Sequence, residues 1–197
     1  KSKIMTSISV LENIHKKGLF GDYEGKNENE LVKIIERKDL LIVQIAQYKN
    51  SSTKDINIDG LKLSNEALKV NCNNDTRILW SGPKNWLLTS TKKNLLENIK
   101  KTCNENDFAV TDLSHSRVVI EIEGTNSKEI LKKGCPYNFN ELKKNNCVNS
   151  VFNGITITVD MMDDNPINLR LLALRSFGES LYHSVTDACL EDGYKNL

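Results

Sequence analysis

Asp112, Ser114 and His115 are the residues whose types come closest to a reactive centre, because an acid, a hydroxyl and an imidazole make up a hydrolytic triad. In an extended segment Asp112 and Ser114 point to one face and His115 to the other, whereas a triad requires the base between the acid and the nucleophile. The GxSxG turn of the hydrolase elbow is also missing from the sequence. The segment therefore predicts a structural, hydrogen-bonding turn.

The cysteines and histidines do not have the spacing of a known kind of site. Cys135 precedes Pro136 just after an expected helix end, where the helix dipole disfavours a thiolate, so we expect a buried structural thiol. The five cysteines are odd in number and contain no CxxC pair, which predicts reduced thiols rather than disulfides or a zinc site. His15, His115 and His183 lack metal-ligand spacing. We therefore expect no catalytic, cofactor-binding or metal-binding residue in this chain.

Two tryptophans and three glycine or proline positions were further candidates for binding. Trp80 and Trp86 flank a turn, where core packing and contact with a partner are both open, with core packing preferred. Gly82-Pro83 and Gly124 do not form a GxGxxG motif or a P-loop, so the sequence does not predict a nucleotide site.

The composition limits the class of protein. The 197 residues suit one domain or two small ones and can bury a core without disulfides or metal. The net charge of +1 provides no overall field that would attract nucleic acid or an anionic membrane surface, so partners must be selected by shape. Apolar runs are too short for a signal peptide or a membrane span, which favours a cytoplasmic location.

The elements that position these residues begin with an irregular segment. Residues 1–30 contain few periodic apolar positions and three glycines, which predicts an extended N-terminal arm or a loop, and such an arm often lies on a neighbour. Apolar residues at 32–35 and 40–45 predict two strands, although 30–38 also fits a helix.

The next elements are a loop, a hairpin and a helix. Residues 50–74 are polar and poorly periodic, which predicts a loop with a short helical turn. Residues 77–80 and 86–89 predict two strands joined by the Ser-Gly-Pro-Lys turn. A helix is then expected to run to Thr102, with an apolar face made of Leu95, Leu96, Ile99 and Cys103.

The second half opens with the most regular stretch of the chain. Val118, Ile120 and Ile122 alternate with Val119, Glu121 and Glu123, which predicts a strand with one buried face and one exposed face. Asn126 and Glu129 form a potential capping box for a short helix, and Gly134 is placed to close that helix in a left-handed turn.

After a polar stretch to Asn146, strands are predicted at 154–159 and 168–174 around a turn at 163–166. A final helix capped by Ser176 and Glu179 is expected, with an apolar face made of Phe177, Leu181, Val185 and Ala188 and with His183 on the opposite side.

The two halves have the same order of elements, which predicts an internal duplication. Pseudo-repeats of about 31–107 and 108–197 would together form a single domain, 31–197, after the arm. Because hairpins rather than crossover helices separate the strands, we expect a duplicated, mainly antiparallel α+β fold.

The hairpin sequence Trp-Ser-Gly-Pro-Lys-Asn-Trp-Leu-Leu at 80–88 is similar to a Leu-Gly-Pro-Asp-Glu-Trp-Leu-Leu block of the gamma subunit family of heterotetrameric sarcosine oxidase. The order of further blocks also resembles that family over residues 31–192: Val-Thr-Asp-Leu-Ser-His at 110–115, Gly-Cys-Pro at 134–136 and Arg-Ser-Phe at 175–177. The chain departs from the family pattern at Asn138 and at Asn149-Ser150, where Asp and Arg-Thr are usual.

This resemblance implies a non-catalytic gamma subunit that packs chiefly against the alpha subunit and stabilises the complex with the beta and delta subunits. The implied complex oxidatively demethylates sarcosine to glycine and passes the methyl group to tetrahydrofolate. FAD, FMN, NAD and tetrahydrofolate would be held by alpha and beta, and zinc by delta.

The Asp-Leu-Ser-His start at Asp112 also resembles the folate-binding domain of glycine-cleavage aminomethyltransferases. That likeness implies the duplicated α+β fold. It also leaves open an autonomous folate-dependent one-carbon transferase in which Asp112 holds the pterin.

Overall fold

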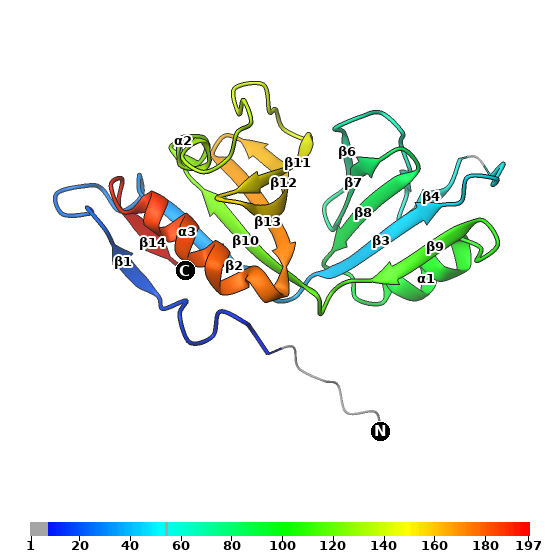
Figure 1. Ribbon diagram of the computed structural model, residues 1–197, viewed down its shortest axis with the longest axis horizontal. Helices are drawn as coiled ribbons and strands as arrows, with labels where there is room; N and C mark the ends of the chain where they lie inside the picture. Colours follow the sequence, from blue (N-terminus) through cyan, green and yellow to red (C-terminus); the bar gives the residue numbers. More distant parts are fainter. Residues whose placement is uncertain (1–7, 54) are drawn as a thin grey trace.

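The computed structural model describes residues 8–53 and 55–197, which are built around two large sheets that lie side by side (Figure 1). The seven-stranded sheet has the spatial order β1 (Gly18–Phe20), β14 (Tyr194–Asn196), β2 (Val32–Glu36), β10 (Arg117–Glu123), β13 (Ile167–Leu174), β12 (Ile155–Asp164) and β11 (Cys147–Phe152). The five-stranded sheet has the order β6 (Val70–Cys72), β7 (Thr76–Gly82), β8 (Asn85–Ser90), β3 (Leu41–Gln47) and β9 (Phe108–Asp112).

The other elements are short. A two-stranded hairpin pairs β4 (Asn57–Ile58) with β5 (Leu61–Lys62), and a 3-10 turn, η1, covers Arg175–Phe177. The helices are α1 (Leu95–Thr102), α2 (Ser127–Lys132) and α3 (Gly178–Cys189). In the part of the chain that the structure describes, paired strands are antiparallel except β14 and β2, which run parallel. The predicted α+β, mainly antiparallel class is confirmed.

The strands predicted from their apolar patterns form, although β12 continues to Asp164, beyond its predicted end at 159 and into the turn predicted at 163–166. These strands are β2, β3, β7, β8, β10, β12 and β13. The helix reading of residues 30–38 is wrong, because β2 occupies 32–36 and pairs with β10. The predicted helix ending at Thr102 is confirmed as α1.

β2 and β9 each pair outside their own half of the chain. β2 precedes β3 in sequence but pairs with β10, with Ile34 opposite Ile122, whereas β9 precedes β10 but pairs with β3, with Val110 opposite Ile45. The order β6-β7-β8-β3-β9 in one sheet then matches β11-β12-β13-β10-β2 in the other. On this basis we propose that 31–107 and 108–197 are pseudo-repeats that exchange their first strands.

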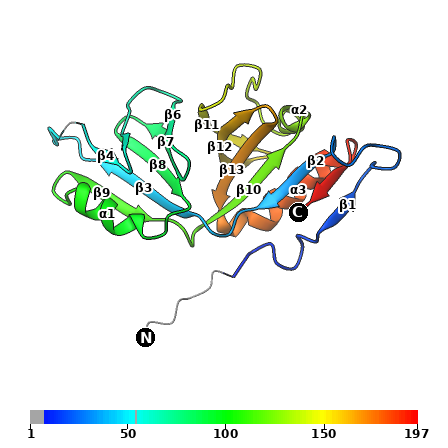
Figure 2. The same cartoon turned by 180° about the vertical axis from the view of Figure 1, so that it is seen from behind.

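Three apolar cores hold these layers together. One lies between the seven-stranded sheet and helices α2 and α3, and a second lies between the five-stranded sheet and α1 (Figure 2). The third lies between the two sheets and includes Leu79 and Leu87 from one sheet and Val119 and Leu172 from the other. The two sheets are therefore packed against each other over an apolar layer of their own.

The edges of the two sheets also meet, at β6 and β11. The backbone N–H of Val70 donates to Asn145 O at 2.9 Å, and that of Cys147 donates to Leu68 O at 2.8 Å, around an antiparallel bridge between Lys69 and Asn146. This seam closes the side of the molecule opposite the connections β2–β3 and β9–β10.

Residues 8–30 of the predicted arm fold back on this chain. Leu11 is fully buried in the core under α3, and β1 pairs with β14. Asp22 N donates to Leu190 O at 2.8 Å, so the segment is also held to the chain just after β1. The prediction of a free extended arm is therefore wrong for residues 8–30, whereas contact of this segment with a neighbour stays a prediction, and residues 1–7 lie outside the described chain.

Several shorter elements differ from the predictions. The expected loop with a helical turn at 50–74 instead contains β4, β5 and β6, and the polar stretch to Asn146 is followed at once by β11. The capping box at α2 is wrong, because the Asn126 amide donates to Asp192 at 3.3 Å and Ser127 Oγ donates to Gly124 O at 2.7 Å. Local sequence was overridden at these places by contacts with distant residues.

Gly134 and Phe177 also differ from their predicted roles. Gly134 is not in the left-handed region; a Cβ there would lie 2.8 Å from Asn153 Oδ1 and from the Phe152 ring, so close packing requires the glycine. α3 begins at Gly178 after η1, which displaces the cap predicted at Ser176, and Phe177 is 48% exposed rather than buried. None of the helices in the described residues is long and apolar enough to cross a membrane.

Candidate functional site

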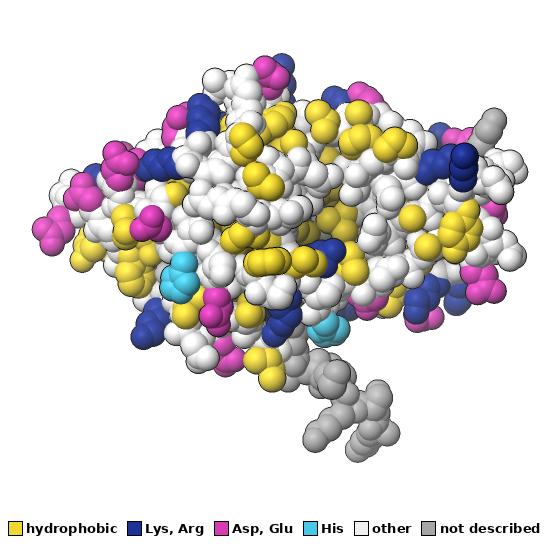
Figure 3. All heavy atoms as spheres, in the orientation of Figure 1, with side chains coloured by type: hydrophobic (Ala, Val, Ile, Leu, Met, Phe, Trp, Pro, Cys, Tyr) yellow, Lys and Arg dark blue, Asp and Glu magenta, His cyan; other side chains and the backbone are white. Residues whose placement is uncertain are grey.

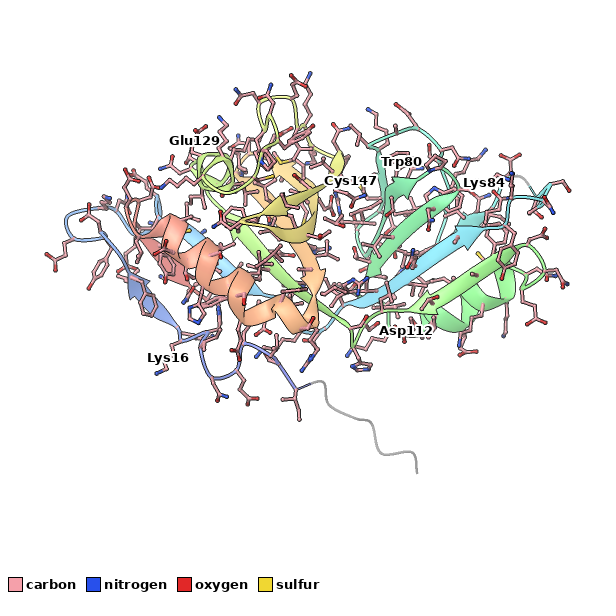
Figure 4. All side chains as sticks on the ribbon, viewed as in Figure 1. Lys16, Trp80, Lys84, Asp112, Glu129 and Cys147 are labelled. Carbon is pink, nitrogen blue, oxygen red and sulfur yellow. The ribbon has the colours of Figure 1, made fainter. Side chains whose placement is uncertain are left out.

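Asp112 lies at the junction between the two halves (Figure 4), where it forms a hydrogen-bonded turn with Ser114. The backbone N–H and the hydroxyl of Ser114 donate to Asp112 Oδ1 at 2.9 and 2.6 Å. Ser114 Oγ in turn accepts from the backbone N–H of Ile42 at 3.0 Å. The hydroxyl is thus used once as donor and once as acceptor, and His115 is exposed. The structure confirms a hydrogen-bonding turn here, and the turn ties the 113–116 connection to β3.

Cys135 is a buried thiol, as its position predicted. Its Sγ donates to Ser150 Oγ at 3.1 Å. Burial raises the pKa of Cys147 and of Cys189 to about 12, and that of Cys103 to about 11. Because the thiolate is the nucleophilic form, these groups are unreactive near neutral pH. All five cysteines are free.

The three histidines do not form a common site, although His15 and His183 both lie beside the Tyr182 ring, with centroids 5.4 and 6.1 Å from it. His15 Nε2 lies 3.0 Å from Leu197 O, and its ring meets Tyr182 edge-on with centroids 5.4 Å apart. His115 and His183 are exposed. Within residues 8–53 and 55–197, His, Cys, Asp and Glu side chains do not gather in groups of three that could hold a metal ion.

The two tryptophans have different environments. Trp86 is 2% exposed, and its Nε1 donates to Ser64 O at 2.7 Å, so it belongs to the core as preferred. Trp80 is half-buried beside the apolar layer between the sheets. A pocket of about 420 Å³ opens above Trp86 and Phe108, but the Gln47 amide in its wall already donates to Ser51 Oγ and Thr53 O.

The positions that depart from the family pattern make internal contacts. The Asn138 amide donates to Glu141 at 2.7 Å within its own loop. Asn149 accepts from Thr158 at 2.7 Å across β11 and β12, and Ser150 accepts from the Cys135 thiol.

The most concentrated chemistry is a layer of charges between the sheets, which the sequence reasoning missed. Arg170 donates through Nε and Nη2 to Glu121 Oε1 at 2.9 and 2.7 Å, and through Nη1 to Thr89 Oγ1 at 3.2 Å. Arg77 donates through Nε and Nη2 to the two carboxylate oxygens of Asp160 at 2.6 and 2.7 Å. Arg77 and Thr89 belong to the five-stranded sheet and the other three residues to the seven-stranded sheet.

The two arginines and two carboxylates of this layer balance in charge, and Glu121 Oε2 also accepts from Arg37 Nη1 at 3.5 Å. Glu121 is 3% exposed, Arg170 5% and Asp160 0%. Burial alone lowers the pKa of Arg77, but hydrogen bonds and attraction to Asp160 more than offset it, so the pKa is raised. Each charge is satisfied by its neighbour, so the arrangement can fix the two sheets relative to each other and does not offer a free acid or base.

The sequence contains a signal for this layer of buried charges, in the form of charged residues inside apolar strands. Glu121 and Arg170 interrupt strands that are otherwise apolar, and Glu121 was assigned to the solvent side because the strand alternates. The prediction that β10 is half-buried is wrong, since its five central residues are all buried. The second face is covered by the other sheet, which sequence period alone does not reveal.

Comparison with known proteins places this geometry in a family. A family profile described as "SoxG: Sarcosine oxidase, gamma subunit family" matches residues 54–191. The chain is similar to the protein named sarcosine oxidase subunit gamma from Corynebacterium sp. (strain U-96), at 28% identity over 119 residues. That match covers 59% of this chain and 57%, a little over half, of the length of the curated relative.

Two solved structures share the fold. One is the heterotetrameric sarcosine oxidase from Corynebacterium sp. U-96 in complex with pyrrole 2-carboxylate, with a TM-score of 0.72, 22% identity, and coverage of 84% of this chain and 87% of that chain. The other is the glycine cleavage system aminomethyltransferase T from Bartonella henselae, with a TM-score of 0.56, 9% identity, and coverage of 79% and 45%. At these identities the likeness concerns the fold alone, and it confirms the expected similarity in fold to aminomethyltransferase.

Proposed function

The chain belongs to the sarcosine oxidase gamma subunit family, and from this premise we propose that it is a non-catalytic subunit that stabilises a heterotetrameric sarcosine oxidase. The complex would oxidatively demethylate sarcosine to glycine, with the methyl group passed to tetrahydrofolate. The non-catalytic role is supported by one observation: the polar groups that could take part in a reaction are already bonded within the chain. The Ser114 hydroxyl and the carboxylates of Asp160 and Glu121 all form such contacts.

The cofactors of the proposed complex would be held by other chains. FAD, FMN, NAD and tetrahydrofolate are assigned to alpha and beta, and zinc to delta, with this chain packed chiefly against alpha. The buried arginines, Arg77 and Arg170, are neutralised by carboxylates and so are not available to a cofactor phosphate.

Co-expression with and without this chain tests the proposal. The alpha, beta and delta subunits of the same source are purified alone and with it, and thermal stability and sarcosine turnover are measured for both preparations. We expect the complete complex to melt at a higher temperature, because an obligate interface is buried in it, with the chemistry per intact complex unchanged. Failure of the chain to co-purify with the other subunits would contradict the proposal.

The alternative, an autonomous folate-dependent one-carbon transferase, is tested separately. A ligand that binds the folded chain must raise its stability by mass action. Because we propose that this chain does not bind folate, titration of the isolated chain with tetrahydrofolate should leave its melting temperature unchanged. A dose-dependent rise that is lost in Asp112→Ala would favour the alternative.

A further inference from the structure

Three large hydrophobic side chains are exposed together where the N-terminal segment meets the end of β13. Ile8 is 71% exposed, Leu174 44% and Phe177 48%. The segments are in contact, because Arg175 Nη2 donates to the backbone oxygen of Ile8. Figure 3 shows hydrophobic side chains beside a Lys or Arg side chain near the middle of one face, where Figure 1 places the end of β13 and the start of α3.

Two arginines lie within the same surface. Arg117 is the cross-strand neighbour of Leu174, and the backbone N–H of Arg175 donates to Ser116 O at 2.9 Å. Among the residues that the structure describes, neither arginine has a carboxylate within 4.0 Å. The other three arginines of the chain, Arg37, Arg77 and Arg170, all form ion pairs.

The surroundings of these arginines do not neutralise them. Arg117 and Arg175 line a shallow groove together with Glu36. The Glu36 carboxylate is already engaged, because Ser9 Oγ donates to it and Lys38 Nζ lies 3.4 Å away. Burial lowers the pKa of Arg117, so this guanidinium is partly removed from water without a counter-charge. A carboxylate brought by another molecule would supply that counter-charge.

We propose that this surface, Ile8, Leu174, Phe177, Arg117 and Arg175, hereafter the arginine-apolar patch, docks the chain onto a larger oxidase subunit that presents an apolar surface with carboxylates at its rim. The proposal deepens the proposed function and depends on it. Exposed aromatic and arginine side chains are typical of the energetically dominant part of an interface.

A second copy of this chain does not fit the patch. A two-fold contact places the same residues of both copies against each other, so that four unneutralised arginines would meet. Such like-charge contact costs several kcal/mol at an interface. An acidic partner surface has the opposite effect, since it converts uncompensated charges into ion pairs.

Binding of variants to the co-expressed alpha, beta and delta subunits tests the patch. Arg117→Glu/Arg175→Glu and, separately, Phe177→Ser should each weaken binding at least about tenfold, since truncated central residues dominate interface energy. The matched control is Lys100→Glu/Lys101→Glu in α1, which makes the same charge change on the other half. Control binding should stay within about twofold, since charges outside an interface add little. Melting curves of each lone variant confirm that it folds.

Hydroxyl-radical footprinting gives a second readout that does not need a variant. Leu174 and Phe177 should be modified in the isolated chain and protected in the complex. Two results would overturn the proposal. Protection of these residues in the isolated chain would mean that the chain itself, including residues 1–7, covers the patch. A sedimentation coefficient that shows a dimer, and that the arginine variant returns to that of a monomer, would mean that a second copy covers it.

Two further outcomes separate this inference from the proposed function. If the wild-type chain binds and both patch variants bind with the same affinity, the patch assignment is overturned and the subunit role is not affected. Absence of wild-type binding overturns both.

Discussion

Arg77 on β7 and Asp160 on β12 belong to different sheets, and their side chains meet in two parallel hydrogen bonds of 2.6 and 2.7 Å. Asp160 is fully buried, and the Arg77 side chain is 12% exposed. The pair lies in the same layer as Arg170 and Glu121, so the polar and apolar contacts between the sheets reinforce each other. Loss of one partner therefore leaves a charge inside the protein.

Asp160→Asn should lower the free energy of unfolding by about 3 kcal/mol, because a buried guanidinium then lacks its counter-charge. Urea denaturation followed by circular dichroism measures the change. The double variant Arg77→Met/Asp160→Leu should recover most of the loss, since replacement of a whole buried pair by apolar residues is close to neutral.

The control for this pair is the exposed ion pair of Lys62 and Asp55, whose side chains are 66% and 76% exposed. Asp55→Asn should change the free energy of unfolding by less than about 1 kcal/mol, because solvent screens exposed pairs. Equal effects of Asp160→Asn and Asp55→Asn would contradict the role of the buried pair.

Gly193→Ala should detach the N-terminal segment from the C-terminal strand. Gly193 has φ +70, and a Cβ there would lie 2.6 Å from Asp22 O. Gly154→Ala provides the control, since φ is +83 and the nearest atoms are more than 4 Å away. The control should lose about 1 kcal/mol from the left-handed backbone alone, and Gly193→Ala about 2 kcal/mol more from the clash. Limited proteolysis around residues 21–26 should accelerate only in Gly193→Ala.

Ser114→Ala should affect stability and leave the chemistry of the assembled oxidase unchanged. The variant leaves the Ile42 backbone N–H without its acceptor, at a cost of about 1 kcal/mol in unfolding free energy. Turnover of sarcosine by the purified complex should change far less than the roughly 100-fold expected for loss of a general base. A drop of that size with intact assembly would mean that the turn takes part in catalysis.

Stability should fall in alkaline solution because of the buried thiols. The pKa values of Cys147 and Cys189 are raised from 9.0 to about 12 in the folded chain, so the unfolded chain loses these protons first. The stabilising contribution is therefore complete below pH 9 and is lost as pH rises from 9 to about 12. Urea midpoints measured across this range should decrease.

Cys147→Ala/Cys189→Ala distinguishes the thiols from other groups that titrate in this range. The variant should be less stable near neutral pH, because two buried side chains are truncated, but its urea midpoint should decrease less steeply between pH 9 and about 12. A residual slope is expected, because the pKa of Tyr182 is also raised to about 12 by burial. An unchanged slope would show that the thiols do not control the alkaline transition.

The sequence was sufficient for the strands that carry their own apolar signal and insufficient for those that depend on a partner. β3 is predicted by its run of apolar residues and β10 by the alternation of its side chains, and both signals lie within the strand itself. β6 is only three residues long and β11 reads Cys-Val-Asn-Ser-Val-Phe, so both are defined by pairing with β7 and β12 rather than by local preference.

The charge layer and the arginine-apolar patch were hidden for related reasons. Glu121 occupies an alternate position of its strand, where the period-2 pattern predicts solvent, and only the second sheet explains its burial. Phe177 was assigned to the buried face of the last helix, but the chain enters α3 through a 3-10 turn. A 3-10 turn has three residues per turn instead of 3.6, so the phase changes there and Phe177 points outward.

The position of β14 between β1 and β2 determines when the molecule can be completed during synthesis. β1 is an edge strand whose neighbour in the sheet is β14, formed by residues 194–196. A ribosome therefore releases the N-terminal strand long before the strand that pairs with it has been translated. The seven-stranded sheet can be completed only after residue 196 has been translated, so a polypeptide that stops before residue 194 would leave the backbone of residues 18–20 without its β-strand partner.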